Sequence, residues 1–316
     1  MRDGRLPDFI IIGAAKSGTT SLHDYLARHP QVCLSTSEDP AVRNKEPCFF
    51  DPDVNWSRGL AWYRELFSAA GADQVCGEAS TNYTRHPQVA GVPARIAATV
   101  PNVRLLYLMR DPIERAYSHY VHRWSRELHP GEPFRENFGE FVAHDPVCLD
   151  SSDYEMQIRR YWEHFPREAL LLLRMDDLLS NPAPLLRRVC GFIGVDPDCD
   201  LLTAGPVASN PGGVSEEMLR YRFTKPLRQI PGAESLGRWV PKAWRDRVYD
   251  LVRGSGAGRR VRDAYRPEPL TPEDRRHLLE RFRDSNHFLR EECGIDTDSW
   301  GSRPHSGRVG AQVQAP

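Results

Sequence analysis

Short, continuous apolar runs alternate with longer amphipathic stretches along this chain. The apolar runs are rich in Ile, Leu and Val, and they predict buried strands at 8–14, 74–80, 103–109 and 169–175. Apolar residues at helical spacing predict helices at 20–30, 57–70, 113–127, 153–165, 182–193 and 272–293. Strands that alternate with helices favour an α/β fold with a central, mostly parallel sheet flanked by helices, in three layers.

The first predicted strand runs directly into the stretch GAAKSGTTS, residues 13–21. Against the phosphate-loop pattern G-x-x-x-x-G-K-[ST], both glycines and Thr20 fit, but Thr19 holds the lysine position and the lysine lies earlier, at Lys16. A strand, a Gly-rich turn and a helix gather backbone N–H groups and the positive helix end around one point. With Lys16 and the hydroxyls of Ser17, Thr19 and Thr20, we expect a P-loop-type phosphate site rather than an ordinary glycine turn.

The strand at 103–109 ends in Arg110-Asp111-Pro112. Asp111 before a proline is typical of a helix N-cap with proline at the first helical position. Arg110 then lies at the carboxyl edge of the sheet, where its guanidinium suits a second phosphate. Ser118, two turns into the following helix, offers a hydroxyl to the same group. The alternative for Arg110 alone is a surface ion pair.

Composition narrows the functional classes. A chain of 316 residues with 40% hydrophobic content builds a well-buried core, and its net charge of −1 provides no general attraction for nucleic acid or an anionic membrane. The seven cysteines include no C-x-x-C pair, so we expect reduced thiols, no metal site and a cytoplasmic protein. The first strand leaves no room for a signal peptide, and its apolar run is far shorter than the roughly 20 residues of a membrane span.

One segment differs from the rest. We expect a single domain over 1–300, interrupted at about 205–262 by an insertion rich in Gly, Pro, Trp and Arg, and a disordered tail at 301–316. Between Arg220 and Arg266 there are 13 Lys and Arg residues against 4 Asp and Glu. Two interpretations stay open: a solvated helical insertion, or an anion-facing lid over the site.

Two motifs together, KSGTTS at 16–21 and RDPIERAYSHY at 110–120, resemble the sulfotransferases that use 3′-phosphoadenosine 5′-phosphosulfate (PAPS). The similarity is to the branch that includes the heparan sulfate N- and O-sulfotransferases and bacterial relatives. It extends to NKEPCFFD (44–51), GLAWYRELF (59–67), GEASTNY (77–83), the block 165–182 and the FIGV turn (192–195).

The resemblance implies roles for named residues. It assigns the 5′-phosphosulfate to Lys16, Gly18, Thr19, Thr20 and Ser21, and the 3′-phosphate to Arg110 and Ser118, with Ser17 in the same loop. It makes Arg266 a further candidate for a phosphate contact.

Sulfuryl transfer needs a cation beside the leaving phosphate and a base beside the acceptor hydroxyl, and no metal if the cation is a side chain. The resemblance gives these roles to Lys16 and Glu46, and two phenylalanines after Glu46 favour partial desolvation. Glu78 is the rival base, although its place at a strand end suggests that it organises loops. The heparan sulfate 3-O-enzymes carry a histidine at the position of Cys48 and a lysine at that of Ala79. These positions help to bind a sulfated polysaccharide in that family, so we expect the acceptor to be bound differently here.

We therefore expect a sulfotransferase that acts on a hydroxyl of a carbohydrate, lipid or secondary metabolite. Two alternatives remain at the level of sequence. A small-molecule P-loop kinase would use ATP and Mg²⁺, but the displaced lysine and Arg110 count against it. A non-catalytic nucleotide-binding protein would be expected to have lost Lys16, Glu46 or Arg110.

Overall fold

The computed structural model describes residues 4–37, 39, 42, 45–127, 136–205 and 268–301, with the side chains of 124–127 excepted. Nearly all of the predicted insertion at 205–262, Arg266 and the tail beyond 301 therefore lie outside the described residues. The chain divides into two compact units. The first comprises 1–116, 145–209 and 272–304, and the second comprises 117–144, 210–271 and 305–316. The prediction of a single domain stays a prediction.

A five-stranded parallel sheet forms the centre of the first unit, in the order β2-β3-β1-β4-β5. Its strands are β1 (Phe9–Gly13), β2 (Val32–Leu34), β3 (Val75–Ala79), β4 (Arg104–Met109) and β5 (Leu170–Arg174). The central strand, β1, pairs with β3 on one side and β4 on the other, so that Phe9 lies between Gly77 and Arg104. The four predicted strands are confirmed, whereas β2, with three residues, was missed because it is too short for a periodic signal.

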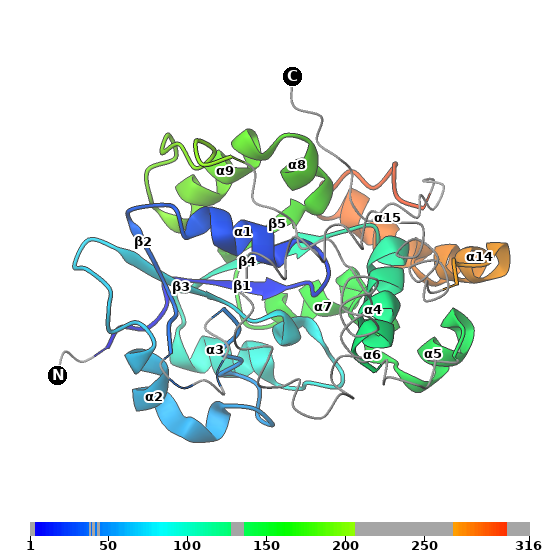
Figure 1. Cartoon of the computed structure of the whole chain (residues 1–316), viewed down its shortest axis with the longest axis horizontal. Coiled ribbons are helices and arrows are strands. Elements are labelled where there is room, and N and C mark those ends of the chain that lie inside the picture. Colours follow the sequence, from blue (N-terminus) through cyan, green and yellow to red (C-terminus); the bar gives the residue numbers. More distant parts are fainter. Residues whose placement is uncertain are drawn as a thin grey trace, which may run out of the picture. The chain divides into compact units, whose positions relative to one another are not determined.

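Helices cover both faces of this sheet (Figure 1). One face carries α1 (Thr19–Leu26), α8 (Met175–Ser180) and α9 (Pro182–Ile193), and the other carries α2 (Gly59–Glu65), α3 (Val92–Thr99) and α7 (Tyr154–Trp162). The remaining elements of the first unit are α6 (Val147–Asp150), α14 (Pro272–Arg281), α15 (Arg283–Glu291) and the single turns η1 (Trp56–Arg58), η2 (Thr81–Thr84) and η3 (Arg167–Ala169). The predicted three-layer α/β architecture is confirmed.

The alternation of side chains along β1 divides the core into two clusters. Phe9 and Ile11 pack with Leu22 of α1 and with α9, whereas Ile10 and Ile12 pack with α2, α3 and α7. All four side chains are fully buried, which explains why the strand reads as a continuous apolar run rather than an alternating one.

Each predicted helix is present, whereas α3, α5 (Phe138–His144), α6 and α8 were not predicted. The helix at 182–193 has the predicted bounds, but the one predicted at 272–293 is divided at Phe282, whose side chain is fully buried. Helix α3 was missed because it follows Gly91 in a left-handed conformation and has a proline in its first turn, two residues that are also typical of a loop.

The second unit is described here only in part. Helix α4 (Pro112–Glu127) continues into it from the first unit, and α5 (Phe138–His144) belongs to it entirely. Tyr117 and Tyr120 pack against Phe138 with ring centroids 6.4 and 5.7 Å away. This unit therefore has an aromatic core of its own.

The described helices include none that is long and apolar enough to cross a membrane. All seven cysteines are free thiols. The cytoplasmic location stays a prediction.

Asp111 joins the start of α4 to the C-terminal segment of the first unit. Its Oδ1 accepts hydrogen bonds from the backbone N–H groups of Ile113 at 2.9 Å and Glu114 at 3.3 Å, and its Oδ2 accepts one from Gly301 at 2.6 Å. The predicted N-cap is confirmed, and it has a second function that the sequence did not indicate, the attachment of a segment 190 residues away.

Because one carboxylate satisfies three backbone donors, Asp111→Ala is expected to lower the free energy of unfolding by about 1–2 kcal/mol. Urea denaturation followed by circular dichroism measures this change. Asp198→Ala, at a side chain that is 81% exposed, is the control and should change it by less than about 0.5 kcal/mol. Equal effects of the two substitutions would contradict the role given to Asp111.

Candidate active site

The loop between β1 and α1 has an unusual backbone. Gly18, the N-cap of α1, has a φ of +87°, a left-handed conformation that favours glycine. Lys16 also has a positive φ, +72°, which is uncommon for a residue with a side chain and clusters at functional sites. No side chain caps the N-terminus of α1, so its first backbone N–H groups face outward from the helix end.

Lys16 is half-buried among positive charges. Within the described part of the chain its ammonium group makes no hydrogen bond and no ion pair. Burial lowers its pKa, and the nearby charges of Arg110, Arg115 and Lys45 lower it further, while Glu46 acts in the opposite direction. A group of cations around one unpaired ammonium is a site prepared for an anion.

Arg115 supports the loop from beneath. Its side chain is fully buried, and its guanidinium donates to the Ala15 carbonyl at 3.2 Å, to the Ser152 hydroxyl and to the Cys148 carbonyl. A buried guanidinium with neutral acceptors keeps its charge, so Arg115 adds positive potential under the loop while it fixes the loop in place. The sequence reasoning gave it no role, although it lies in the same motif as Arg110.

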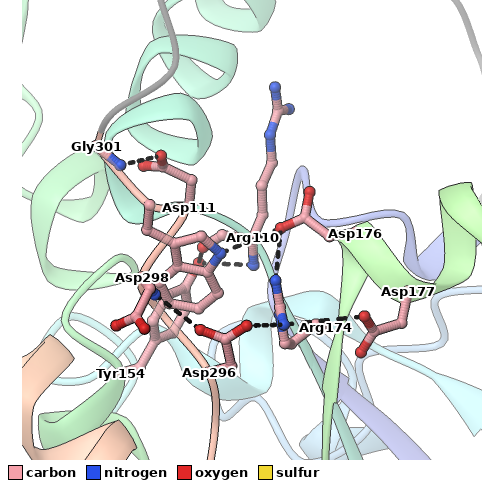
Figure 2. A network of polar contacts seen from close by, with 10 residues as sticks. Arg110, Asp111, Tyr154, Arg174, Asp176, Asp177, Asp296, Asp298 and Gly301 are labelled. Carbon is pink, nitrogen blue, oxygen red and sulfur yellow. Dashed lines mark hydrogen bonds and ion pairs between the residues drawn. The ribbon is translucent and has the colours of Figure 1, made fainter.

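Arg110 follows β4, and its backbone and side chain take different directions (Figure 2). Its carbonyl accepts a hydrogen bond from the Tyr154 hydroxyl at 2.7 Å, while its side chain extends away from the carboxylates in the figure. Burial is the main influence on the pKa of the Arg110 guanidinium and lowers it, whereas the Glu114 carboxylate, at 3.6 Å, raises it. The ion-pair alternative is therefore real, but Glu114 also pairs with Arg275 at 3.3 Å, which leaves one carboxylate for two guanidinium groups.

The network beside Arg110 fastens the C-terminal segment to the sheet (Figure 2). Arg174, at the end of β5, pairs with Asp296 at 3.1 Å and with Asp176 at 3.6 Å. Trp300 donates its indole N–H to Asp176 at 3.1 Å. These contacts fix the end of β5, and they pair the carboxylates of Asp176 and Asp296 with Arg174 and Trp300.

Glu46 is connected to the loop through its neighbour Lys45. The Lys45 ammonium donates to the Thr20 hydroxyl at 2.7 Å and lies 3.6 Å from the Glu46 carboxylate, which also accepts from the Thr81 hydroxyl at 3.2 Å. The structure thus brings Glu46 to the same sheet edge as Lys16. Lys45 is a site residue to which the sequence analysis gave no role, although its position next to Glu46 was a usable signal.

Glu78, the rival base, is fully buried below this surface. Its Oε1 accepts from the hydroxyls of Tyr63 at 3.1 Å and Tyr83 at 2.9 Å, and its Oε2 accepts from Ser80 at 2.5 Å. The Ser80 and Tyr83 hydroxyls in turn accept the backbone N–H groups of Cys48 and Phe50. Glu78 therefore holds the segment that carries Glu46, as its strand-end position suggested.

The other predicted residues are distributed unevenly. Thr19 and Ser21 are buried on α1, Ser17 is buried beside the Tyr154 hydroxyl, and Thr20 is exposed. Ser118 is half-buried on α4 in the second unit, so its assigned contact stays a prediction, as does that of Arg266, which lies outside the described residues. The structure brings Lys16, Thr20 and Glu46 together through Lys45 and surrounds Lys16 with Arg110 and Arg115.

Burial raises the pKa of Glu78 from 4.5 to about 7. Between these pH values the folded protein holds a proton that the unfolded chain has lost, so stability falls as the pH rises through this window. Each pKa unit corresponds to about 1.4 kcal/mol, so Glu78 accounts for a decrease of roughly 3 kcal/mol.

Glu78→Gln cannot ionise but keeps an oxygen for the two tyrosines, so this variant is expected to lack that decrease. Urea denaturation at a series of pH values from 4 to 8 compares the two proteins. Parallel curves for wild type and variant would show that Glu78 does not titrate in this window.

Comparison with known proteins extends these observations. The sulfotransferase domain family matches residues 6–207. The human bifunctional heparan sulfate N-deacetylase/N-sulfotransferase 3 is 34% identical over 206 residues, which cover 61% of this chain and 23% of that protein. The mouse heparan sulfate glucosamine 3-O-sulfotransferase 3B1 is 34% identical over 200 residues, 60% of this chain and 47% of that protein. The chain thus spans less than half of either relative.

Among solved structures, a sulfotransferase from Alicyclobacillus acidocaldarius superposes with a TM-score of 0.51 at 25% identity, over 76% of this chain and 99% of that one. The family match covers the sheet, the loop at 13–21 and the Arg110 motif. The chain belongs to the sulfotransferase family.

Proposed function

We propose that this chain transfers the sulfuryl group of PAPS to a hydroxyl of a carbohydrate, lipid or secondary metabolite. The observation that carries the proposal is the unpaired, half-buried ammonium of Lys16 among Arg110, Arg115 and Lys45, at the same sheet edge as the Glu46 carboxylate. Membership of the family supports the donor, since its enzymes use PAPS. The curated relatives carry heparan sulfate in their names, which makes a carbohydrate acceptor one of the candidates.

The residues present fit a donor with phosphate groups in two places. Lys16 and the uncapped start of α1 offer a cation and backbone donors for the 5′-phosphosulfate. Arg110, which shares its carboxylate with Arg275, offers a guanidinium for the 3′-phosphate. Ser118 and Arg266 remain proposed contacts to the same donor.

Two side chains of this protein provide the base and the cation that the reaction needs. Glu46 accepts the proton of the acceptor hydroxyl as that oxygen attacks, and Lys16 stabilises the negative charge that develops on the leaving phosphate. Lys45 contacts both the carboxylate of Glu46 and the Thr20 hydroxyl, so it fixes the base relative to the loop. Donor and acceptor are the substrates, and no resident cofactor enters the proposal.

The kinase alternative has less support. It requires Mg²⁺ held beside the loop by carboxylates, and a Lys at the position of Thr19. In the described residues, the carboxylates of Glu46 and Glu114 instead pair with Lys45 and Arg110. We propose that turnover needs no metal and that nucleic acid is not a partner.

Thermal denaturation distinguishes the two donors. The product 3′,5′-adenosine bisphosphate is expected to raise the melting temperature, because a ligand at 100 times its dissociation constant stabilises the folded state by roughly 2.7 kcal/mol. ATP with Mg²⁺ should do so less, and EDTA should not alter the rate of sulfate transfer. Stabilisation by ATP with Mg²⁺ but not by the bisphosphate would refute the proposal.

Two substitutions separate the two ends of the site. Lys16→Ala is expected to lower turnover at least 100-fold while the chain still folds, because the variant loses one group that stabilises charge in the transition state.

Glu46→Gln should keep bisphosphate binding and lower turnover by a factor of 10²–10⁴. Radiolabelled PAPS and an acceptor found by screening extracts provide the assay, with the exposed Glu168→Gln as control. Loss of bisphosphate binding in Glu46→Gln would indicate a structural residue instead.

A further inference from the structure

Arg85 is a positive charge of the first unit to which neither the motifs nor the family resemblance assigns a function. It directly follows η2, the single turn that leaves β3 at the carboxyl edge of the sheet. Thr81, the first residue of that turn, donates to the Glu46 carboxylate at 3.2 Å. Thr84, the last one, donates to the Ile12 carbonyl at 3.3 Å, which fastens the turn to β1. Arg85 therefore extends from a fixed turn beside the proposed base.

The guanidinium of Arg85 makes no direct ion pair within the part of the chain that the structure describes. Its Nε is buried without a hydrogen-bond partner, and no hydrogen bond or ion pair forms at its other nitrogens. Buried charges in proteins are normally paired, because an isolated one loses its hydration without compensation. Arg64 of α2 shares this lack of a partner, so it is the position of Arg85, after the turn that contacts Glu46, that points to a ligand.

Arg85 and Lys16 have charged neighbours in common. Burial lowers the pKa of Arg85, and among the neighbouring charges Glu46 and Asp51 raise it while Arg115 lowers it. The charged neighbours of Lys16 are Arg110, Arg115, Lys45 and Glu46. Glu46 and Arg115 are common to both sets. Arg85 and Lys16 thus lie near the same carboxylate, Arg85 on the turn after β3 and Lys16 on the loop after β1.

From this arrangement we infer that Arg85 binds an acidic group of the acceptor, a carboxylate or a sulfate, and positions the acceptor's hydroxyl at Glu46. The inference rests on the proposed function, whose acceptor it narrows to hydroxyl compounds that carry such a group near the reacting oxygen. A guanidinium forms two parallel hydrogen bonds with either group.

Two other positions do not provide this charge. Ala79 is fully buried in the apolar cluster with α1 and α9, and its backbone N–H donates to the Lys45 carbonyl at 3.2 Å. Burial raises the pKa of the Cys48 thiol to about 12, so this side chain is neutral. Arg85 therefore supplies the cation for the acceptor from a different element of the chain.

The test uses matched pairs of acceptors, the 4-nitrophenyl β-glucoside with its glucuronide, and glucosamine with glucosamine 6-sulfate. Sulfate transfer from radiolabelled PAPS gives kcat/KM for each compound. The wild-type chain is expected to prefer the acidic member of a pair. Arg85→Gln should lower that preference by about 100-fold, and Arg85→Lys should retain part of it, because a lysine keeps the charge without the paired geometry.

The control is Arg64→Gln, at a half-buried arginine of α2 whose Nε likewise lacks a hydrogen-bond partner among the described residues. It should leave the preference as it is in the wild type. Thermal denaturation adds a second readout: since Arg85 has no partner to lose, Arg85→Gln should melt at the same or a higher temperature, whereas a structural arginine would show a decrease.

The possible failures are distinguishable. If 3′,5′-adenosine bisphosphate does not stabilise the wild type, the proposed function itself is wrong. If the bisphosphate binds but the acidic compounds are not preferred, are not sulfated, or lose no more than the neutral ones in Arg85→Gln, the assignment of Arg85 is wrong and the proposed function is unaffected.

Discussion

The site depends on holding several positive charges close together without matching negative ones. Two unit charges at 4 Å repel by about 4 kcal/mol at the effective dielectric constant near a protein surface. Lys16 has three cationic neighbours, and burial and these neighbours lower its pKa. The repulsion is tolerable because each neighbour is restrained separately: Arg115 by two carbonyls and a hydroxyl, Arg110 by Glu114, and Lys45 by Thr20 and Glu46. The anion that relieves the repulsion is then bound by preformed geometry.

The two glutamates of the site show how environment separates roles. Glu46 lies half-buried against Lys45, whereas Glu78 is fully buried, accepts three hydroxyl hydrogen bonds and has its pKa raised to about 7. A carboxylate enclosed in this way has no access to an acceptor hydroxyl, but through Ser80 and Tyr83 it fixes the backbone that carries Glu46. Ordinary cross-strand packing does not explain a buried carboxylate at this position. In the proposed mechanism Glu78 defines the geometry of the base.

The sequence predicted the parts of the fold whose signal is local. Continuous apolar runs identified four of the five strands, and Asp111 before Pro112 identified the start of α4. The divided helix at Phe282 and the short strand β2 were missed, since each is set by packing against distant elements rather than by its own pattern. In the site, the motifs identified Lys16, Arg110 and Glu46. Lys45, Arg115 and Arg85 were not recognised, because a charged residue reveals its partners, or their absence, only when the chain is folded.

Some site residues belong to sequence motifs and others are recognised only in the folded chain, which explains why the donor can be inferred more firmly than the acceptor. Donor contacts come from two contiguous motifs, each of which follows a strand, so the parallel sheet necessarily brings them to one edge. The proposed acceptor contact is instead the single residue Arg85, which follows η2, where one substitution changes the charge. The buried Ala79 and the unpaired Arg85 lie six residues apart in the same segment, yet only the second presents a charge toward Glu46. Family membership therefore constrains the reaction, whereas in our proposal the acceptor is selected by a residue that the family motifs do not include.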